Sequence, residues 1–208
     1  NTTGSDNTAV GNCALCSSTT NTRNTAIGTQ AMRAATGASE TVAVGGCALC
    51  KNTTGCRNTA VGFQAHFNSQ TGIRNTSIGY RALYENSTGN FNVAVGEQAL
   101  SNFTGNSTTA VGMYALLSNT TGGNNTASGA YSLCKNTTGS QNTAHGRDSM
   151  FYNTTGSDNT AFGRASLYCN TTGASNTAVG KDTMFNNTSG TKNTAVGLKA
   201  LLTNSTGS

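Results

Sequence analysis

Proline and tryptophan are absent from the 208-residue sequence, and only 9% of the residues are charged. Globular chains average about 25% charged residues, so this is not the composition of an ordinary enzyme. Hydrophobic residues make up 35% of the chain, many of them alanine, which is too little for one thick globular core. A thin core that is repeated along the chain is the natural alternative.

Charge of one sign is not concentrated in any segment. Twelve basic residues against seven acidic residues give a formal net charge of +5, but the basic residues are dispersed. Neither a basic run nor a regular interleaving with aromatics is present, which argues against a nucleic-acid partner. No apolar run approaches the roughly 18 residues of a membrane span, and the first residues contain no signal-peptide pattern. We expect a soluble chain without a membrane span.

The sequence does contain one pattern, N-T-A-V-G-x-x-A-L-x-x-N-T-T-G-x-x, that fills it from residue 1 to residue 208 as a single repeat array. A short unit rich in glycine and asparagine fits one turn of a β-solenoid or β-roll. We therefore predict an all-β fold of twelve 17-residue turns. The anchoring glycines are 17 residues apart, except for one step of 16: Gly11, Gly28, Gly45, Gly62, Gly79, Gly96, Gly112, Gly129, Gly146, Gly163, Gly180 and Gly197.

Within each unit, similar residues recur at fixed positions. Val or Ile precedes the anchoring glycine in nine of twelve units, and Leu or Met follows it by four residues except at His66. Two further positions are small, beginning at Ala9 and at Ala14. We expect stacking to turn all four positions into buried ladders. The N-T-T-G motif predicts a turn, and the short arc around "QAL" or "RAL" is either extended or a single helical turn.

No catalytic, cofactor-binding or metal-binding residues are predicted. His66 and His145 replace apolar ladder residues, so we interpret both as core substitutions. "HGRD" at 145–148 lacks a nucleophile, and the sequence has no P-loop motif. The acids lie in different units, so none is paired by sequence for acid–base catalysis: Asp6, Glu40, Glu85, Glu97, Asp148, Asp158 and Asp182.

Two C-x-x-C pairs, "GNCALC" at 11–16 and "GGCALC" at 45–50, raise the question of a zinc site. The pairs are two turns apart, so like sulfur atoms would be separated by roughly 10 Å, whereas zinc needs all four sulfurs at about 2.3 Å. Local disulfides, Cys13 to Cys16 and Cys47 to Cys50, are the better chemical interpretation. Seven cysteines is an odd number, so at least one is free or pairs with another chain.

Sequons for N-glycosylation are dense, and two interpretations of them stay open. Either glycans coat one flank of the solenoid, or Asn and Thr serve turn geometry and amide ladders and the sequon is a by-product. Sites three residues before a turn glycine are Asn1, Asn52, Asn86, Asn102, Asn119, Asn136, Asn153, Asn170, Asn187 and Asn204. Asn75, Asn106, Asn124 and Asn186 also satisfy the pattern and are weaker candidates.

Apolar residues stand next to one another in "NTAVG" and in "xxALxx", so both faces of an extended segment would be apolar. We expect the second face to be covered by lateral association with copies of the chain, for example in a trimer. The array starts and ends in the same phase, which also favours end-to-end pairing or a segment of a longer fibre. A regular column of Thr before "AVG" further suggests an ice-binding face, although a single column is narrower than paired ranks.

The units "NTAVGFQAHFNSQTGIRNTSIGYRALYENSTG" and "NTAVGLKALLTNSTG" resemble the NTAxGxxAL/NTTG repeats of tail-fibre-like and surface fibre proteins of the endosialidase-chaperone type. They are similar, more loosely, to the β-roll heads of trimeric autotransporter adhesins. The resemblance covers all twelve units and implies an extended fibre outside the cell, often trimeric, without catalytic residues. No chaperone domain or stalk is present.

The sequence as a whole favours a structural protein that needs no cofactor, located outside the cell or on a cell or virion surface. The first interpretation is a module of an extracellular filament or surface fibre, N-glycosylated along the turn ladder. The alternatives are the shaft of a phage-type tail fibre or bacterial adhesin, and an ice-binding solenoid.

Overall fold

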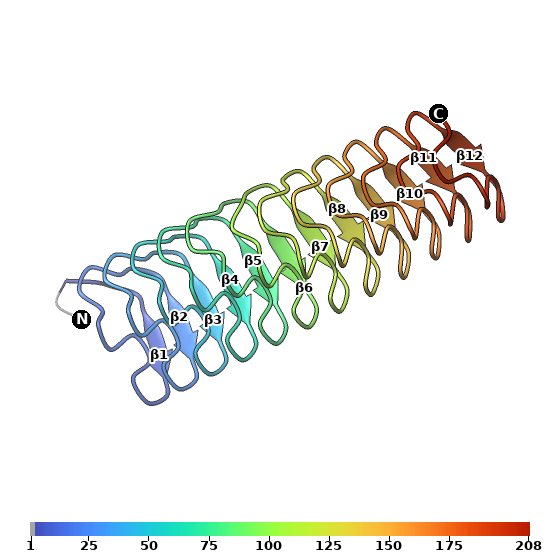
Figure 1. The fold of residues 1–208 in the computed structure, drawn as a ribbon. Coiled ribbons are helices and arrows are strands. Elements are labelled where there is room, and N and C mark those ends of the chain that lie inside the picture. Colours follow the sequence, from blue (N-terminus) through green and yellow to red (C-terminus); the bar gives the residue numbers. More distant parts are fainter. Residues whose placement is uncertain (1–2) are drawn as a thin grey trace. The chain divides into compact units, whose positions relative to one another are not determined.

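The computed structural model describes residues 3–208 and divides the chain into two compact units, Asn1–Asn106 and Ser107–Ser208. The division falls in the one repeat step that has 16 residues, between Gly96 and Gly112. In each unit every repeat makes one turn of a β-solenoid, as predicted, and contributes one short strand to a parallel sheet (Figure 1). Within residues 3–208 the structure contains no helix.

Strands in each unit pair in chain order and in register, so that each position of the repeat stacks on its own copy. For example, Thr59, Ala60 and Val61 pair with Thr76, Ser77 and Ile78. The first unit holds β1 (Thr8–Val10), β2 (Thr25–Ile27), β3 (Val42–Val44), β4 (Thr59–Val61), β5 (Thr76–Ile78) and β6 (Val93–Val95). The second unit holds β7 (Thr109–Val111), β8 (Thr126–Ser128), β9 (Thr143–His145), β10 (Thr160–Phe162), β11 (Thr177–Val179) and β12 (Thr194–Val196).

Each strand points only its middle residue into the solenoid. Ala60 is fully buried, whereas its neighbour Val61 is 36% exposed. Side chains alternate between the two faces of a strand, so an inward alanine forces both neighbours outward. The prediction that the Val and Ile column is a buried ladder is therefore wrong. The Ala9 column is correctly predicted as interior, and Ala26, Ala43 and Ala94 are fully buried.

The arc after each anchoring glycine supplies the larger apolar side chains of the core. Leu49, Leu83, Leu116 and Leu167 are fully buried, as expected for the Leu and Met column. The small column that begins at Ala14 is also interior and becomes serine at Ser132, Ser149 and Ser166, all fully buried. Each turn contributes only small side chains and one Leu or Met to the core. A content of 35% hydrophobic residues is therefore enough to fill the interior.

The arc is a pair of tight turns. In one repeat, Ala48 N–H donates to Gly45 O at 3.2 Å and Asn52 N–H donates to Leu49 O at 3.0 Å. Cys47 and Leu49 lie in the left-handed region, with φ of 56° and 49°. Backbone N–H groups of the arc also bond to the next turn, as from Leu49 N–H to Ala65 O at 3.0 Å. Left-handed Leu is uncommon, and these inter-turn bonds hold it in place.

Asparagine side chains form a hydrogen-bonded ladder at the start of most strands, with Thr41 and Thr108 as the exceptions. Asn159 Oδ1 accepts from the backbone N–H of Asn176, one turn on, at 3.0 Å. Asn159 Nδ2 donates to Gly173 O at 2.8 Å and to Asn142 Oδ1 at 3.1 Å. Asn159 and Asn176 are fully buried, so the amide satisfies backbone groups that would otherwise be unpaired.

The anchoring glycines permit the close stacking of turns. Gly62 has φ of 133°, a conformation that L-residues rarely adopt. A Cβ atom at this position would lie 2.6 Å from the carbonyl oxygen of Gly79 on the next turn. Both observations explain why the repeat requires glycine at this position.

Candidate interaction surfaces and modification sites

Most of the sequon asparagines lie inside the solenoid. Asn136 Nδ2, the atom to which a glycan would be attached, donates to Asn119 Oδ1 at 3.1 Å and to Gly139 O at 2.9 Å. The same contacts recur along the second unit, from Asn153 to Asn136 at 2.8 Å and from Asn170 to Asn153 at 2.7 Å. Fully or nearly fully buried members of the predicted set are Asn52, Asn75, Asn86, Asn119, Asn136, Asn153, Asn170 and Asn187.

This burial conflicts with the interpretation that glycans line the turn ladder. A glycan on Nδ2 would remove a donor and would need space that the stacked turns occupy. The other interpretation, that the asparagines form amide ladders, is the arrangement found in the structure. In the turn itself the amide also binds locally, since Asn52 Oδ1 accepts from Gly55 N–H at 3.0 Å.

A few sequon asparagines are accessible. Asn102, Asn106, Asn124 and Asn186 are exposed, and three of these were the weaker candidates by sequence. Asn102 is exposed because the 16-residue step shifts the repeat, so that Phe103 takes the buried ladder position. Asn204 is half-buried, and Asn1 lies outside the described residues.

The four cysteines of the C-x-x-C pairs are free thiols in the structure, and neither predicted bridge is formed. Cys16 Sγ–H donates to Arg33 O at 3.9 Å, and Cys47 Sγ–H donates to Gln30 Oε1 at 3.7 Å. Both thiols therefore bond to the intervening turn. Among residues 3–208, no group of three or more His, Cys, Asp or Glu side chains is placed to hold a metal ion.

Two of these thiols are held in the protonated form. The neighbouring thiol of Cys16 raises the pKa of Cys13, and burial raises the pKa of Cys50. Thiolate is the reactive species, so a raised pKa lowers the reactivity of both thiols at neutral pH.

The two histidines have different environments. His66 is fully buried in the Leu column, as predicted, and burial lowers its pKa to about 4. His145 is exposed at the outer end of β9 and stacks on Phe162, with ring centroids 4.5 Å apart. The interpretation of His145 as a core substitution is therefore wrong, because its column faces outward.

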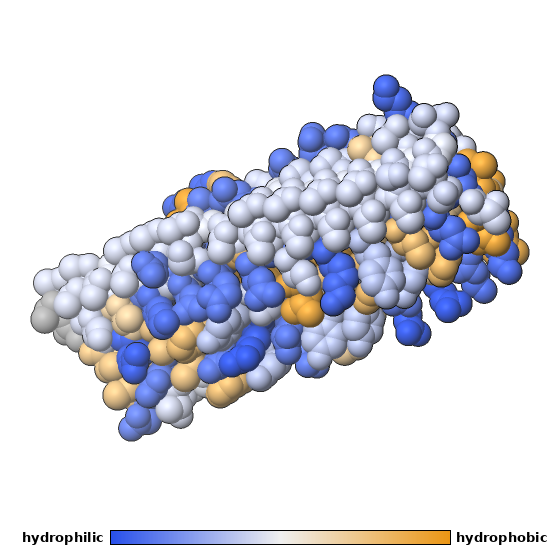
Figure 2. Space-filling view, viewed as in Figure 1, coloured by the Kyte–Doolittle hydropathy of each residue, from blue (hydrophilic) through white to orange (hydrophobic). Residues whose placement is uncertain are grey.

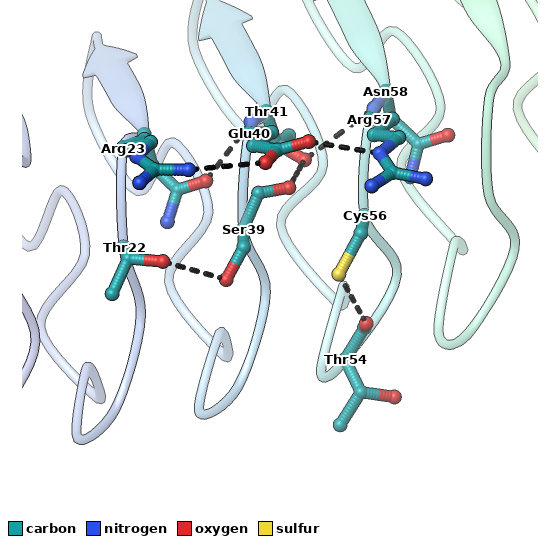
Figure 3. A network of polar contacts seen from close by, with 10 residues as sticks. Thr22, Arg23, Ser39, Glu40, Thr41, Thr54, Cys56, Arg57 and Asn58 are labelled. Carbon is teal, nitrogen blue, oxygen red and sulfur yellow. Dashed lines mark hydrogen bonds and ion pairs between the residues drawn. The ribbon is translucent and has the colours of Figure 1, made fainter.

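Glu40 bridges two arginines on the outer surface, one on each neighbouring turn (Figure 3). Arg57 Nε donates to Glu40 Oε2 at 2.8 Å, and Arg23 Nη1 donates to Oε1 at 3.3 Å. The hydrogen bond from Arg57 holds the pKa of the Glu40 carboxyl below its usual value. All three side chains are well exposed, so this ion network is a surface ladder of small energetic weight.

Other acids also pair with a neighbouring cation. Asp148 Oδ2 lies 3.1 Å from Arg147 Nε, and Asp182 Oδ2 lies 3.9 Å from Lys181 Nζ. These pairs lie on separate turns and join adjacent residues. Such an arrangement stabilises local charge and positions no acid–base couple.

The outer face of the sheet in the first unit is uncharged. Thr and Val or Ile alternate with the buried alanines, and Val42 and Val93 add apolar surface in the Thr column. In the Val and Ile column that precedes the anchoring glycines, the exposed fraction is 40% at Ile27 and Ile78 and 57% at Val10. Figure 2 shows apolar groups mixed with hydrophilic ones along the visible surface. The sheet face of this unit is therefore an uncharged surface on which apolar side chains repeat from turn to turn.

Aromatic rings stack along the arc of the second unit. Phe151 and Tyr168 are 5.5 Å apart with an interplanar angle of 19°, and Tyr168 and Phe185 are 4.8 Å apart at 11°. Tyr152 contacts Tyr168 edge to face at 5.3 Å. Aromatic pairs of this kind contribute about 0.5–1.5 kcal/mol each beyond burial. They strengthen the stacking of consecutive turns.

No protein-family model, curated protein or solved structure matches the chain. The described residues include no helix with the length and apolar character needed to cross a bilayer. Sequence reasoning placed the Val column in the interior, whereas it faces outward, and it left open whether the turn asparagines carry glycans or form amide ladders. The sequence carries no signal that decides which residue of Ala-Val faces inward, because both are apolar.

Proposed function

We propose that the chain is a non-catalytic structural module of an extracellular filament or surface fibre. The observation that carries the proposal is the in-register stacking of similar turns, in which buried asparagine side chains form hydrogen bonds with the neighbouring turn. Solenoids of this kind are nearly one-dimensional, so they add length without changing cross-section. The resemblance of the repeat to surface fibre proteins supports the same function, and a tail-fibre or adhesin shaft is the closest alternative.

Glycans, if the fibre is secreted, belong on the exposed sequons and not on the ladder. Asn124 and Asn186 project from the surface of the second unit, whereas the ladder amides hold its turns together. The proposed fibre is therefore sparsely glycosylated, and its stability comes from the amide ladders.

Lateral association of copies is proposed to use the uncharged sheet face of the first unit. Val61 and Ile27 lie in one column of this face, 36% and 40% exposed. Stacked sheets pack face to face, and every copy presents the same spacing between turns, so the face is complementary to itself. A second copy of the chain is thus the partner that matches its chemistry and its period.

Light scattering of the full chain with paired variants tests this association. Ile27→Lys combined with Val61→Lys places two charges on the face and should reduce the particle mass to that of the 21.1 kDa chain. Thr54→Lys with Thr88→Lys adds the same charge on exposed turn residues and should leave the multimer intact. A wild-type particle of single-chain mass at all concentrations would contradict lateral association.

Ice binding remains a second candidate because Thr and Val or Ile form two outward ranks on one sheet face. In the second unit Ser128, His145 and Phe162 interrupt the Val rank, which disrupts a regular match to a lattice. Thermal hysteresis measured on the purified chain decides this candidate. A freezing point equal to the melting point would remove it.

A further inference from the structure

The turn that begins at Gly62 departs from the repeat at two inward positions. His66 stands in the column that holds Leu49 and Leu83 on the neighbouring turns. Ser69 stands in the ladder column that holds Asn52 on one neighbouring turn and Asn86 on the other. In this turn the imidazole ring of His66 replaces an aliphatic side chain. The shorter side chain of Ser69 replaces an amide.

Both substituted side chains are fully buried and leave polar atoms without protein partners. Within the described part of the chain, Nδ1 and Nε2 of His66, Oγ of Ser69 and Oδ1 of Asn86 make no hydrogen bond. Ser69 N–H donates to His66 O at 3.2 Å, so the two residues close the same tight turn. Buried polar groups in proteins are almost always satisfied, because an unsatisfied one destabilises the folded chain.

Asn86 stands one turn after Ser69 in the same ladder column, so its amide belongs to the same group of atoms. In the regular ladder, Asn136 Oδ1 accepts from Asn153 Nδ2. The ladder neighbours of Asn86 are Ser69 and Phe103, and neither has an amide to offer. Asn86 Nδ2 donates to Gly105 O at 3.1 Å, and the side chain and backbone of Asn86 lie close enough to the His66 ring to raise its pKa against the effect of burial.

The charged side chains of this segment lie on the outer wall. Lys51 packs over the ring of Phe67 at 5.0 Å, Arg81 packs over Tyr84 at 4.8 Å, and Glu85 is exposed. The ring of His66 therefore meets only neutral groups and is itself neutral at pH 7. A neutral imidazole offers one donor and one acceptor, a hydroxyl offers both, and an amide oxygen accepts.

We propose that His66, Ser69 and Asn86 form an internal hydration site that holds ordered water between two turns of the first unit. Water is the ligand that matches a mixed set of fully buried neutral donors and acceptors. A buried water typically makes about three hydrogen bonds to groups that are otherwise unsatisfied. In this site the water takes over the hydrogen bonds that a ladder amide makes on other turns.

The inference also links the two substitutions. Serine is smaller than asparagine, so Ser69 leaves space in the ladder column. In the proposed site the His66 ring and water fill this space. Each substitution is then tolerated because of the other. His66→Leu combined with Ser69→Asn restores the Leu and Asn arrangement of the neighbouring turns, with Leu83 and Asn86 on one of them.

Nuclear magnetic resonance on the full chain tests the site directly. Cross peaks between water and the ring protons of His66, with the sign of a long-lived bound water, are expected in the wild type. The Leu49 methyl groups, in the same column one turn earlier, should show no such cross peaks and serve as the internal control. Absence of the His66 cross peaks in the folded chain would overturn the proposal.

Thermal unfolding of the two single variants and the double variant tests the coupling. The double variant is expected to melt above the wild type, and at least one single variant below it, because a single change leaves the site either crowded or incompletely hydrated. Additive effects of the two substitutions would overturn the compensation, even where all three variants fold.

Discussion

Asn153 Nδ2 donates to Oδ1 of Asn136, one turn earlier, at 2.8 Å, and both side chains are fully buried. This relationship repeats along the second unit and ties each turn to the next with polar groups in the interior. Each such bond contributes about 1 kcal/mol net, and losing one partner costs more because the other is left buried and unpaired. The amide ladder therefore contributes stability that in other folds comes from a thicker apolar core.

Asn136→Ala should lower the free energy of unfolding by about 2–4 kcal/mol, since it leaves Asn119 Oδ1 and one hydrogen of Asn153 Nδ2 without a partner. Denaturant unfolding followed by circular dichroism measures the change. Asn186→Ala is the matched control, because Asn186 is exposed and does not have a left-handed backbone, and its effect should stay within about 1 kcal/mol. Equal losses for both variants would contradict the structural role of the ladder.

Gly62→Ala should destabilise the chain by at least about 1–3 kcal/mol, the cost of backbone strain alone. The new Cβ atom would meet Gly79 O at 2.6 Å with φ at 133°. Gly37→Ala is the control, because a Cβ atom there would meet Thr54 Cγ2 at an ordinary 3.6 Å. The control should change stability by less than about 1 kcal/mol, measured by the same unfolding experiment.

Expression in a eukaryotic secretory host should give glycans only at exposed sequons. Peptide mapping after enzymatic removal of N-glycans is expected to find modification at some of Asn102, Asn106, Asn124 and Asn186. Asn119, Asn136, Asn153 and Asn170 should be unmodified in folded material, because a glycan there and the stacked ladder exclude each other. Folded protein that carries glycans on the ladder would refute the placement of these amides.

His66 makes stability depend on pH. Its pKa is about 4 in the folded chain and 6.5 unfolded, so the unfolded state binds more protons between these values. Stability is fully present above about pH 6.5, falls as the pH drops, and levels off near pH 4, with a total loss of about 3 kcal/mol. The difference between wild type and His66→Leu isolates this effect from titrating carboxyls.

The periodic glycines and the alanine positions were enough to predict a β-solenoid, because only stacked short turns use such a unit. The direction of Val61 could not be read in the same way, since Ala60 and Val61 are both apolar and the pattern does not say which one faces inward. The left-handed conformations of Leu49 and Cys47 also escape prediction, because residues with a Cβ atom rarely adopt them. Inter-turn hydrogen bonds, which involve distant residues, impose them.

The candidate sites were harder to predict than the fold. A sequon has the same letters whether its amide faces solvent, as at Asn186, or the interior, as at Asn187. Adjacent residues differ because the tight turn directs Asn187 into the ladder column. Only the three-dimensional turn separates the two cases.

Immunogold electron microscopy of the source cells or particles tests the proposed function most directly. Antibodies raised against the folded chain are expected to label projecting filaments at the outer surface, at regular intervals where the module repeats. Gold confined to the interior, away from any filament, would contradict a role as a surface or extracellular fibre module.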